Sequence, residues 1–188
     1  NVDTVSLPAN VSSVVNVSAV NMQFVDGQVT LGFGTSDISV RRVWVQSPTH
    51  LIANVVVAPG AAINPSEISV ISGFQAVWQA NSFYPQPANP SIPSIGLPLA
   101  NADPTQSTLY SGAVVSMYGS NLGPSSAAIQ LTLNDQPVQI LFASTAQINF
   151  VIPSNFPTGV AILKLNNGSA AAPPIAVEID NPPAASAS

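Results

Sequence analysis

The sequence predicts an all-β protein built from two β-sandwich domains in tandem. No stretch repeats apolar residues at the i, i+3, i+4, i+7 spacing of an amphipathic helix. Instead, short runs rich in Val, Ile, Thr and aromatic residues recur along the chain, which is typical of strands. The chain also has 18 prolines and 11 glycines, and many of them separate these runs, where turns are expected. Its 188 residues suit two sandwiches of about 90–100 residues each, although length alone also allows one larger domain.

The first half contains seven strand-like runs with turn signals between them. Asp26-Gly27 and Ser72-Gly73 are the clearest of these turns. Val43 and Val45 alternate with Trp44, so we expect the two valines and the tryptophan on opposite faces of one strand. The expected strands are Ser13–Val20, Gln28–Phe33, Ile38–Gln46, His50–Val57, Glu67–Ser72, Gln75–Trp78 and Ser82–Tyr84.

A proline-rich stretch follows and predicts the boundary between the domains. Six prolines occur in the stretch from Tyr84 to Pro104 inclusive, and proline lacks the N–H donor that a central strand needs. We therefore expect one sandwich over residues 1–86, a linker over 87–92 and a second sandwich over 93–182. Residues 183–188 contain only Pro, Ala and Ser and predict a disordered tail.

The second half has the same style of short runs. Asn134-Asp135 predicts a tight hairpin turn, and Asn167-Gly168 predicts a type I′ turn. The expected strands are Ile92–Leu97 at an edge, Ala113–Tyr118, Ala128–Leu133, Gln136–Phe142, Gln147–Ile152, Gly159–Asn166 and Pro174–Ile179.

The composition excludes several classes of partner and cofactor. Only 6% of the residues are charged, the net charge is −5, and Arg41, Arg42 and Lys164 are the only basic residues. Nucleic-acid binding and a polybasic membrane patch both need clustered Lys and Arg, so neither is expected. The absence of cysteine excludes disulfides, zinc–thiolate sites and a cysteine nucleophile. Apolar runs such as Leu51–Pro59 are too short to span a bilayer. We expect no cofactor.

Two segments of the second half resemble a known family. Residues 110–123 read Tyr-Ser-Gly-Ala-Val-Val-Ser-Met-Tyr-Gly-Ser-Asn-Leu-Gly, and residues 144–153 read Ser-Thr-Ala-Gln-Ile-Asn-Phe-Val-Ile-Pro. They resemble the conserved C-terminal domain of secreted bacterial proteins of unknown function, itself a relative of the IPT/TIG immunoglobulin-like fold. Ala146 departs from that pattern. Segments of the first half resemble IPT/TIG repeats more weakly, namely Val29–Gly34, Val43–Leu51 and Ile68–Val70.

This resemblance implies two immunoglobulin-like sandwiches in an extracellular setting, and it implies no catalytic residues. The residues themselves agree, because His50 is the only histidine and no G-x-S-x-G motif is present. A pair of carboxylates could in principle hydrolyse a glycosidic bond, but most of the eight acids lie at expected turns or near the termini. Asn101 and Asp103 could contribute to a calcium site near the linker, and capping of a turn is the favoured interpretation.

Five residues are candidates for a ligand surface. Trp44, Trp78 and Tyr84 could form an aromatic platform, although aromatic residues on sheets more often serve packing. Gln147 and Asn149 alternate with apolar residues and would share one face of a strand. We therefore expect a structural or adhesive module acting through protein–protein contact. The alternative is a carbohydrate-binding accessory module of a polysaccharide-processing protein.

Overall fold

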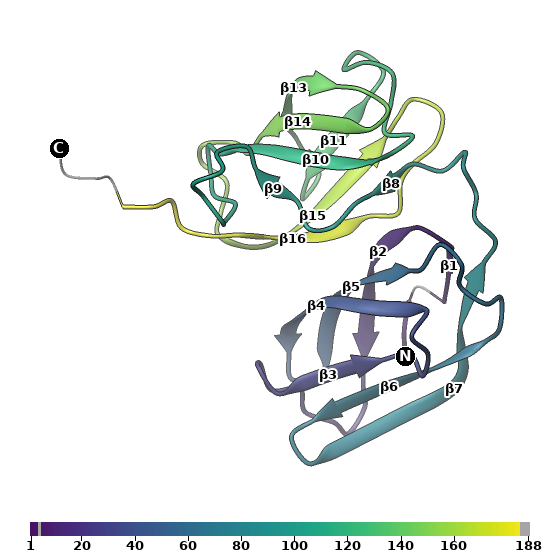
Figure 1. Cartoon of the computed structure of the whole chain (residues 1–188). Helices are drawn as coiled ribbons and strands as arrows, with labels where there is room; N and C mark the ends of the chain where they lie inside the picture. Colours follow the sequence, from purple (N-terminus) through teal and green to yellow (C-terminus); the bar gives the residue numbers. More distant parts are fainter. Residues whose placement is uncertain (4, 185–188) are drawn as a thin grey trace. The chain divides into compact units, whose positions relative to one another are not determined.

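A computed structural model describes residues 1–3 and 5–184 (Figure 1). These residues contain strands and no helix, so the predicted all-β fold is confirmed. The chain divides into two compact units. Unit 1 comprises Asn1–Pro90 and Pro173–Ala176, and unit 2 comprises Ser91–Ala172 and the chain from Val177 onward. The division after Pro90 falls inside the linker expected at 87–92, whose bounds remain a prediction. Of the expected disordered tail, residues 185–188 lie outside the described part.

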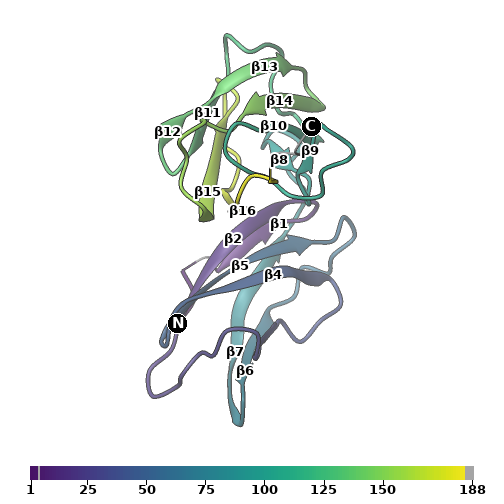
Figure 2. The same ribbon diagram turned by 90° about the vertical axis from the view of Figure 1, so that its left-hand side faces the viewer.

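Unit 1 is a sandwich of two sheets (Figures 1 and 2). All strand pairs are antiparallel except β1–β7, which is parallel. The first sheet has the order β1 (Ser6–Pro8), β7 (Gln75–Gln86), β6 (Ser66–Ser72) and β3 (Val29–Gly32). The second sheet has the order β2 (Ser12–Ser18), β5 (His50–Val57) and β4 (Ile38–Ser47).

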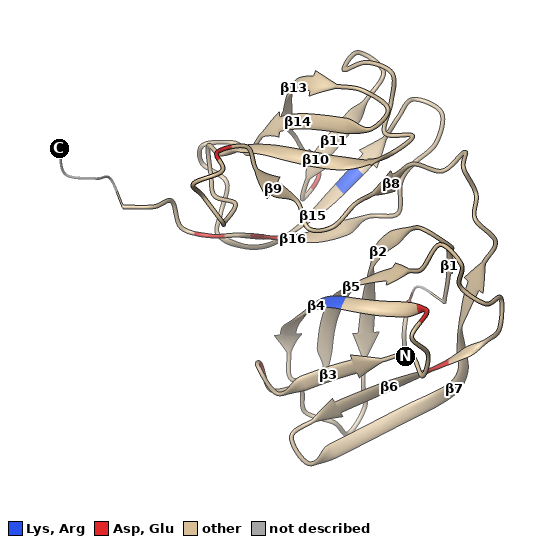
Figure 3. Ribbon diagram, viewed as in Figure 1, with Lys and Arg blue, Asp and Glu red and all other residues tan. Residues whose placement is uncertain are grey.

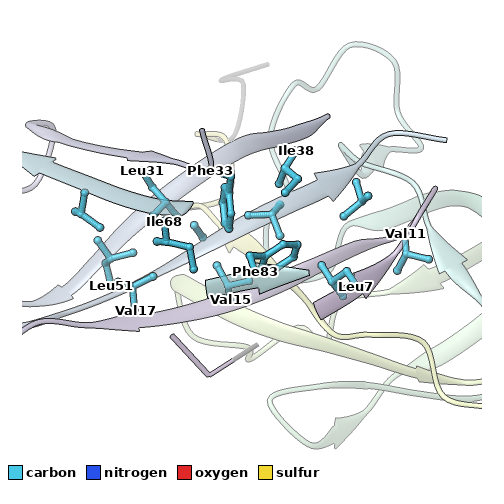
Figure 4. Packing of buried hydrophobic residues seen from close by; sticks show 14 of the residues in the cluster. Leu7, Val11, Val15, Val17, Leu31, Phe33, Ile38, Leu51, Ile68 and Phe83 are labelled. Atoms are coloured by element: carbon cyan, nitrogen blue, oxygen red, sulfur yellow. The ribbon is translucent and has the colours of Figure 1, made fainter. Parts of the chain in front are cut away.

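The facing sides of these sheets form the core of unit 1 (Figure 4). Phe33 and Phe83 meet edge to face, with ring centroids 4.9 Å apart and an interplanar angle of 70°, an arrangement that the ring quadrupoles favour. Val43 and Val45 of β4 pack against this core, whereas Trp44 is not part of it. The predicted alternation along β4 is therefore confirmed.

Unit 2 is a second sandwich. Its core is made of buried residues on facing strands, for example Met117, Ile148, Phe150 and Leu163. One sheet has the order β13 (Gln139–Ala143), β14 (Gln147–Val151), β10 (Val114–Ser120) and β8 (Ser94–Ile95), and β9 (Ala100–Asn101) also pairs with β10. The other sheet has the order β12 (Gln136–Pro137), β11 (Gln130–Leu133), β15 (Gly159–Asn166) and β16 (Ile175–Ile179).

Two strand predictions are wrong. The expected strands Gln75–Trp78 and Ser82–Tyr84 form one strand, β7, because an irregularity that includes the left-handed Asn81 (φ 52°) absorbs the break in the pattern. The expected strand Gln136–Phe142 is two strands, β12 and β13, which belong to different sheets and separate at Val138. The sequence pattern does not distinguish a continuous strand from one that changes sheets.

The two predicted hairpin turns of unit 2 have different outcomes. Asn134 and Asp135 both have positive φ, 46° and 64°, as a two-residue type I′ turn requires, so that tight turn is confirmed. The type I′ prediction for Asn167-Gly168 is wrong, because only Gly168 has positive φ. Asn167 is instead buried, and its Oδ1 accepts hydrogen bonds from the N–H groups of Ser169 and Ala170 at 2.9 and 2.8 Å. The asparagine side chain therefore organises a wider loop.

Candidate functional site

The hairpin of β6 and β7 in unit 1 carries an unusual group of exposed apolar side chains. Gly73 and Phe74 form its two-residue loop, in which only Gly73 has positive φ (57°), the φ pattern of a type II′ turn. This turn leaves Phe74 at the tip, fully exposed. Trp78 is 72% exposed, and Ile71 and Val77 are roughly half exposed. By register, Ile71 and Trp78 lie on the outer face of the hairpin, whereas Val77 lies on the other face, opposite the buried Val70. We call Ile71, Phe74 and Trp78 the hairpin patch.

The same hairpin has an open backbone edge. In the sheet, β7 lies between β6 and β1, but β1 pairs only with Tyr84–Gln86. Along Gln75–Asn81, no described strand covers the second edge of β7, and all seven residues are exposed. The N–H and C=O groups on such an edge can pair with another strand.

The three aromatic candidates of the first half do not form one platform. Trp44 is only 8% exposed and lies on β4 in the other sheet of unit 1, with the guanidinium carbon of Arg42 5.1 Å from its ring centroid. Tyr84 is 42% exposed and lies on β7 beside a hollow of about 260 Å³ lined by residues such as Val5 and Gln79. Tyr84 and Trp78 are six residues apart on β7, which at 3.3 Å per residue separates them by up to about 20 Å.

Gln147 and Asn149 lie on β14 in unit 2, where they share one face of the strand. The Nε2 of Gln147 donates a hydrogen bond of 2.9 Å to Oδ1 of Asn149. The intervening Ile148 and the following Phe150 are buried on the opposite face. The expected common orientation of the two amides is therefore confirmed. A ligand role for any of the five candidates remains a prediction.

Two aromatic residues that the sequence analysis did not select flank this amide pair. Tyr118 of β10 pairs with Gln147, and Phe142 of β13 pairs with Asn149. Their side chains are 55% and 49% exposed. The signal available in the sequence was the apolar–polar alternation of β10, which puts Tyr118 out of phase with the core residue Met117. Phe142 carried no such signal, because an irregularity at Leu141 changes the register of β13.

Acid, base and metal chemistry has few candidate groups in the described part of the chain, and the charged residues are scattered (Figure 3). Nδ1 of His50 lies 3.2 Å from Oγ of Ser18, but no hydrogen bond from His50 to a carboxylate is found among the described residues. A Ser-His-Asp triad would need that third group to orient the imidazole. The described residues contain no cluster of three or more His, Asp or Glu side chains suited to a metal ion.

The expected capping role of Asn101 and Asp103 is confirmed. Oδ1 of Asp103 accepts hydrogen bonds from the hydroxyl and the N–H of Thr105, at 2.7 and 2.9 Å, and these bonds lower the pKa of Asp103. Asn101 in turn accepts a hydrogen bond from the N–H of Asp103 at 3.0 Å. Both side chains therefore stabilise the turn after β9.

The second half, a pair of packed sheets with short strands, matches one known family. Residues 99–177 match the family model of the IPT/TIG domain. The predicted IPT/TIG resemblance of the second half is thereby confirmed. Unit 1 is likewise a sandwich of two sheets. The described residues contain no helix, and hence none able to cross a membrane.

Comparison with other proteins gives only distant likenesses. No curated protein matches the sequence. Domains 5–6 of the S-layer protein SbsC are 13% identical over 97% of both chains, with a TM-score of 0.40. The SGBP-B protein of the Bacteroides ovatus mixed-linkage glucan utilization locus, in complex with a heptasaccharide, is 15% identical over 94% of this chain and 43% of that one, with a TM-score of 0.36. The titin fragment A168–A169 is 12% identical over 96% and 95%, with a TM-score of 0.29. Likenesses this weak carry no information on function.

Proposed function

We propose that this chain is a non-catalytic structural or adhesive module of a secreted or cell-surface bacterial protein, and that it acts through protein–protein contact. The extracellular setting is supported by the IPT/TIG match and by a composition with few charged residues and abundant Ser, Thr and Asn. The observation that carries the contact role is the hairpin patch of unit 1.

The hairpin patch has the chemistry of a protein interface. Large apolar side chains gathered at one place mark contact sites on soluble proteins, and Phe and Trp are enriched in interface cores. The neighbouring Gln75 and Gln79 are polar but uncharged, so contact with a partner would not desolvate a formal charge.

The open edge of β7 supports contact by strand addition. Natural edge strands are usually protected by Lys, Pro or inward-pointing charges. The segment Gln75–Asn81 contains none of these residues. An extended segment of a partner could therefore pair with the backbone of β7 while its side chains pack on the hairpin patch.

Carbohydrate binding through Trp44, Trp78 and Tyr84 is less well supported. Trp44 is buried, and the other two rings lie too far apart along β7 to stack on the same sugar unit. Unit 1 therefore favours the protein-contact function over the carbohydrate alternative.

Contact between two copies of the chain provides the test. In the Trp44→Phe variant, Trp78 is the only tryptophan, so its fluorescence reports directly on the hairpin. Sedimentation velocity over a wide concentration range should detect weak self-association, because a patch of three side chains is small for a stable interface. The emission of Trp78 should shift to shorter wavelength as the associated fraction rises.

Replacing Phe74 by Ser should abolish both signals, and Tyr118→Ala in unit 2 should change neither. Circular dichroism confirms that each variant is folded. A chain that stays monomeric at all concentrations, or one that associates equally well with Phe74→Ser, would contradict the proposal.

A further inference from the structure

A second surface, in unit 2, has a different chemistry from the hairpin patch. It is the outer face of β13, β14 and β10, where Phe142, Asn149, Gln147 and Tyr118 lie side by side according to the strand registers. We propose that this face binds a neutral oligosaccharide. The proposal goes beyond protein contact and uses no residue of unit 1.

The amide pair leaves one strong acceptor and one strong donor available. The bond from Gln147 to Asn149 uses one N–H of Gln147 and an oxygen of Asn149. Among the described residues, neither Oε1 of Gln147 nor Nδ2 of Asn149 has a protein hydrogen-bond partner. The two groups are partly buried and hold each other in place, so they are ordered before a ligand arrives.

These groups suit hydroxyls. A sugar hydroxyl both donates and accepts hydrogen bonds, so adjacent hydroxyls on one pyranose ring can donate to Oε1 of Gln147 and accept from Nδ2 of Asn149. The hydrogen bond between the amides fixes the orientation of both groups, so Oε1 of Gln147 accepts, while Nδ2 of Asn149 and the second N–H of Gln147 donate.

The flanking aromatic rings provide the apolar part of the site. Tyr118 and Phe142 lie on the strands on either side of β14 and stand about half exposed. Beyond Asn149 the sheet continues with the small residues Ser116 and Ala100. The negative face of an aromatic ring attracts the weakly positive C–H groups of a pyranose.

The absence of charge decides the class of sugar. Gln139, Val151 and Val114 also lie on this face by register, and none of the residues named on it is ionisable except the Tyr118 phenol. An anionic polymer would find no cation here. A neutral oligosaccharide matches the uncharged amides and rings.

Native affinity electrophoresis of the full chain tests the proposal, since the net charge of −5 carries the protein into the gel. The gels contain amylopectin, galactomannan, xyloglucan or laminarin as neutral probes, and alginate as an anionic probe. At least one neutral polymer should retard the chain, and alginate should not. Tyr118→Ala and the nearly isosteric, uncharged Asn149→Leu should each weaken retardation by at least about tenfold, the effect of about 1.4 kcal/mol.

Ile63→Ala in unit 1, at an exposed apolar residue outside both surfaces, is the matched control and should leave retardation unchanged. Thermal unfolding followed by circular dichroism shows whether each variant is folded, and Phe142→Ala replaces any variant that is not. No retardation by any neutral polymer, equal retardation by alginate, or loss only with Ile63→Ala would each overturn the proposal. Self-association through the hairpin patch is independent of these outcomes, so the two proposals can fail separately.

Discussion

At the scale of single residues, Gly119 shows how closely two strands approach in unit 2. It lies on β10 opposite Ile95 of β8, and a Cβ at this position would stand 2.1 Å from the carbonyl oxygen of Ser94. Because that oxygen is backbone, β8 must move to admit a methyl group. We expect Gly119→Ala to lower the free energy of unfolding by about 1–3 kcal/mol, as overpacking usually does.

Gly60→Ala is the matched control for Gly119→Ala. Nothing lies within 4 Å of a Cβ at Gly60, and its φ is not in the left-handed region. We expect a change within about 0.5 kcal/mol. Urea unfolding followed by far-ultraviolet circular dichroism measures both variants. If the two variants had the same free energy of unfolding, β8 would move to admit the methyl group at no measurable cost, which would contradict the prediction.

Residue identity predicted the geometry of one hairpin turn of unit 2 and not that of the other. Asn134-Asp135 forms the tight turn that the sequence indicates, because both residue types tolerate positive φ and the flanking strands pair directly. Asn167-Gly168 has the stronger turn signal, yet Asn167 is buried and also donates to the carbonyl of Asn121 at 2.9 Å. That partner is 46 residues away, so a local pattern cannot reveal it.

At the scale of elements, the open edge of β7 should make the chain prone to aggregation. Its segment Gln75–Asn81 is exposed, unpaired on one side and free of charge. We expect Val77→Lys to slow aggregation severalfold on mild heating, because an edge lysine disfavours strand pairing. Val77 is already 43% exposed, so the stability of the monomer should fall by less than about 1 kcal/mol.

Val20→Lys adds the same charge at an exposed position of unit 1 that lies outside every strand. Light scattering during incubation at a fixed temperature compares the two variants with the parent chain. If Val20→Lys protects as well as Val77→Lys, the protection does not depend on the β7 edge.

Most strands could be predicted from the sequence, and the exceptions share a cause. His50–Val57 and Gly159–Asn166 are strands with the expected bounds, since each has apolar residues against a core. The first seven residues of β7 are exposed on both faces, so no alternation announces them as a continuous strand. β1 and β9 have three and two residues, and only their distant partners define them. The common face of Gln147 and Asn149 could be predicted from the alternation along their strand. The position of Phe142 beside Asn149 could not, because it depends on how β13 pairs with β14.

At the scale of the whole molecule, burial rather than charge accounts for stability. With eight acidic and three basic residues in the chain, few ion pairs can form. The pair between Lys164 and Asp135 has an N–O distance of 2.6 Å, but its side chains are 51% and 76% exposed. Solvent screens such a pair, and its contribution is about 0–1 kcal/mol.

A comparison of one buried ring with this ion pair tests that view. Phe83 is fully buried against Phe33 in unit 1, and Phe83→Ala should cost about 3–5 kcal/mol through lost burial and the cavity left behind. Lys164→Ala should cost less than about 1 kcal/mol. Both tryptophans lie in unit 1, so their fluorescence during urea unfolding reports on Phe83→Ala, and circular dichroism reports on Lys164→Ala in unit 2. Salt screens ion pairs and leaves the burial of Phe83 unaffected. Raising the salt concentration should therefore not reduce the difference between the unfolding free energies that Phe83→Ala and Lys164→Ala remove. A loss on Lys164→Ala comparable to that on Phe83→Ala would show instead that the few charges are energetically coupled to the fold.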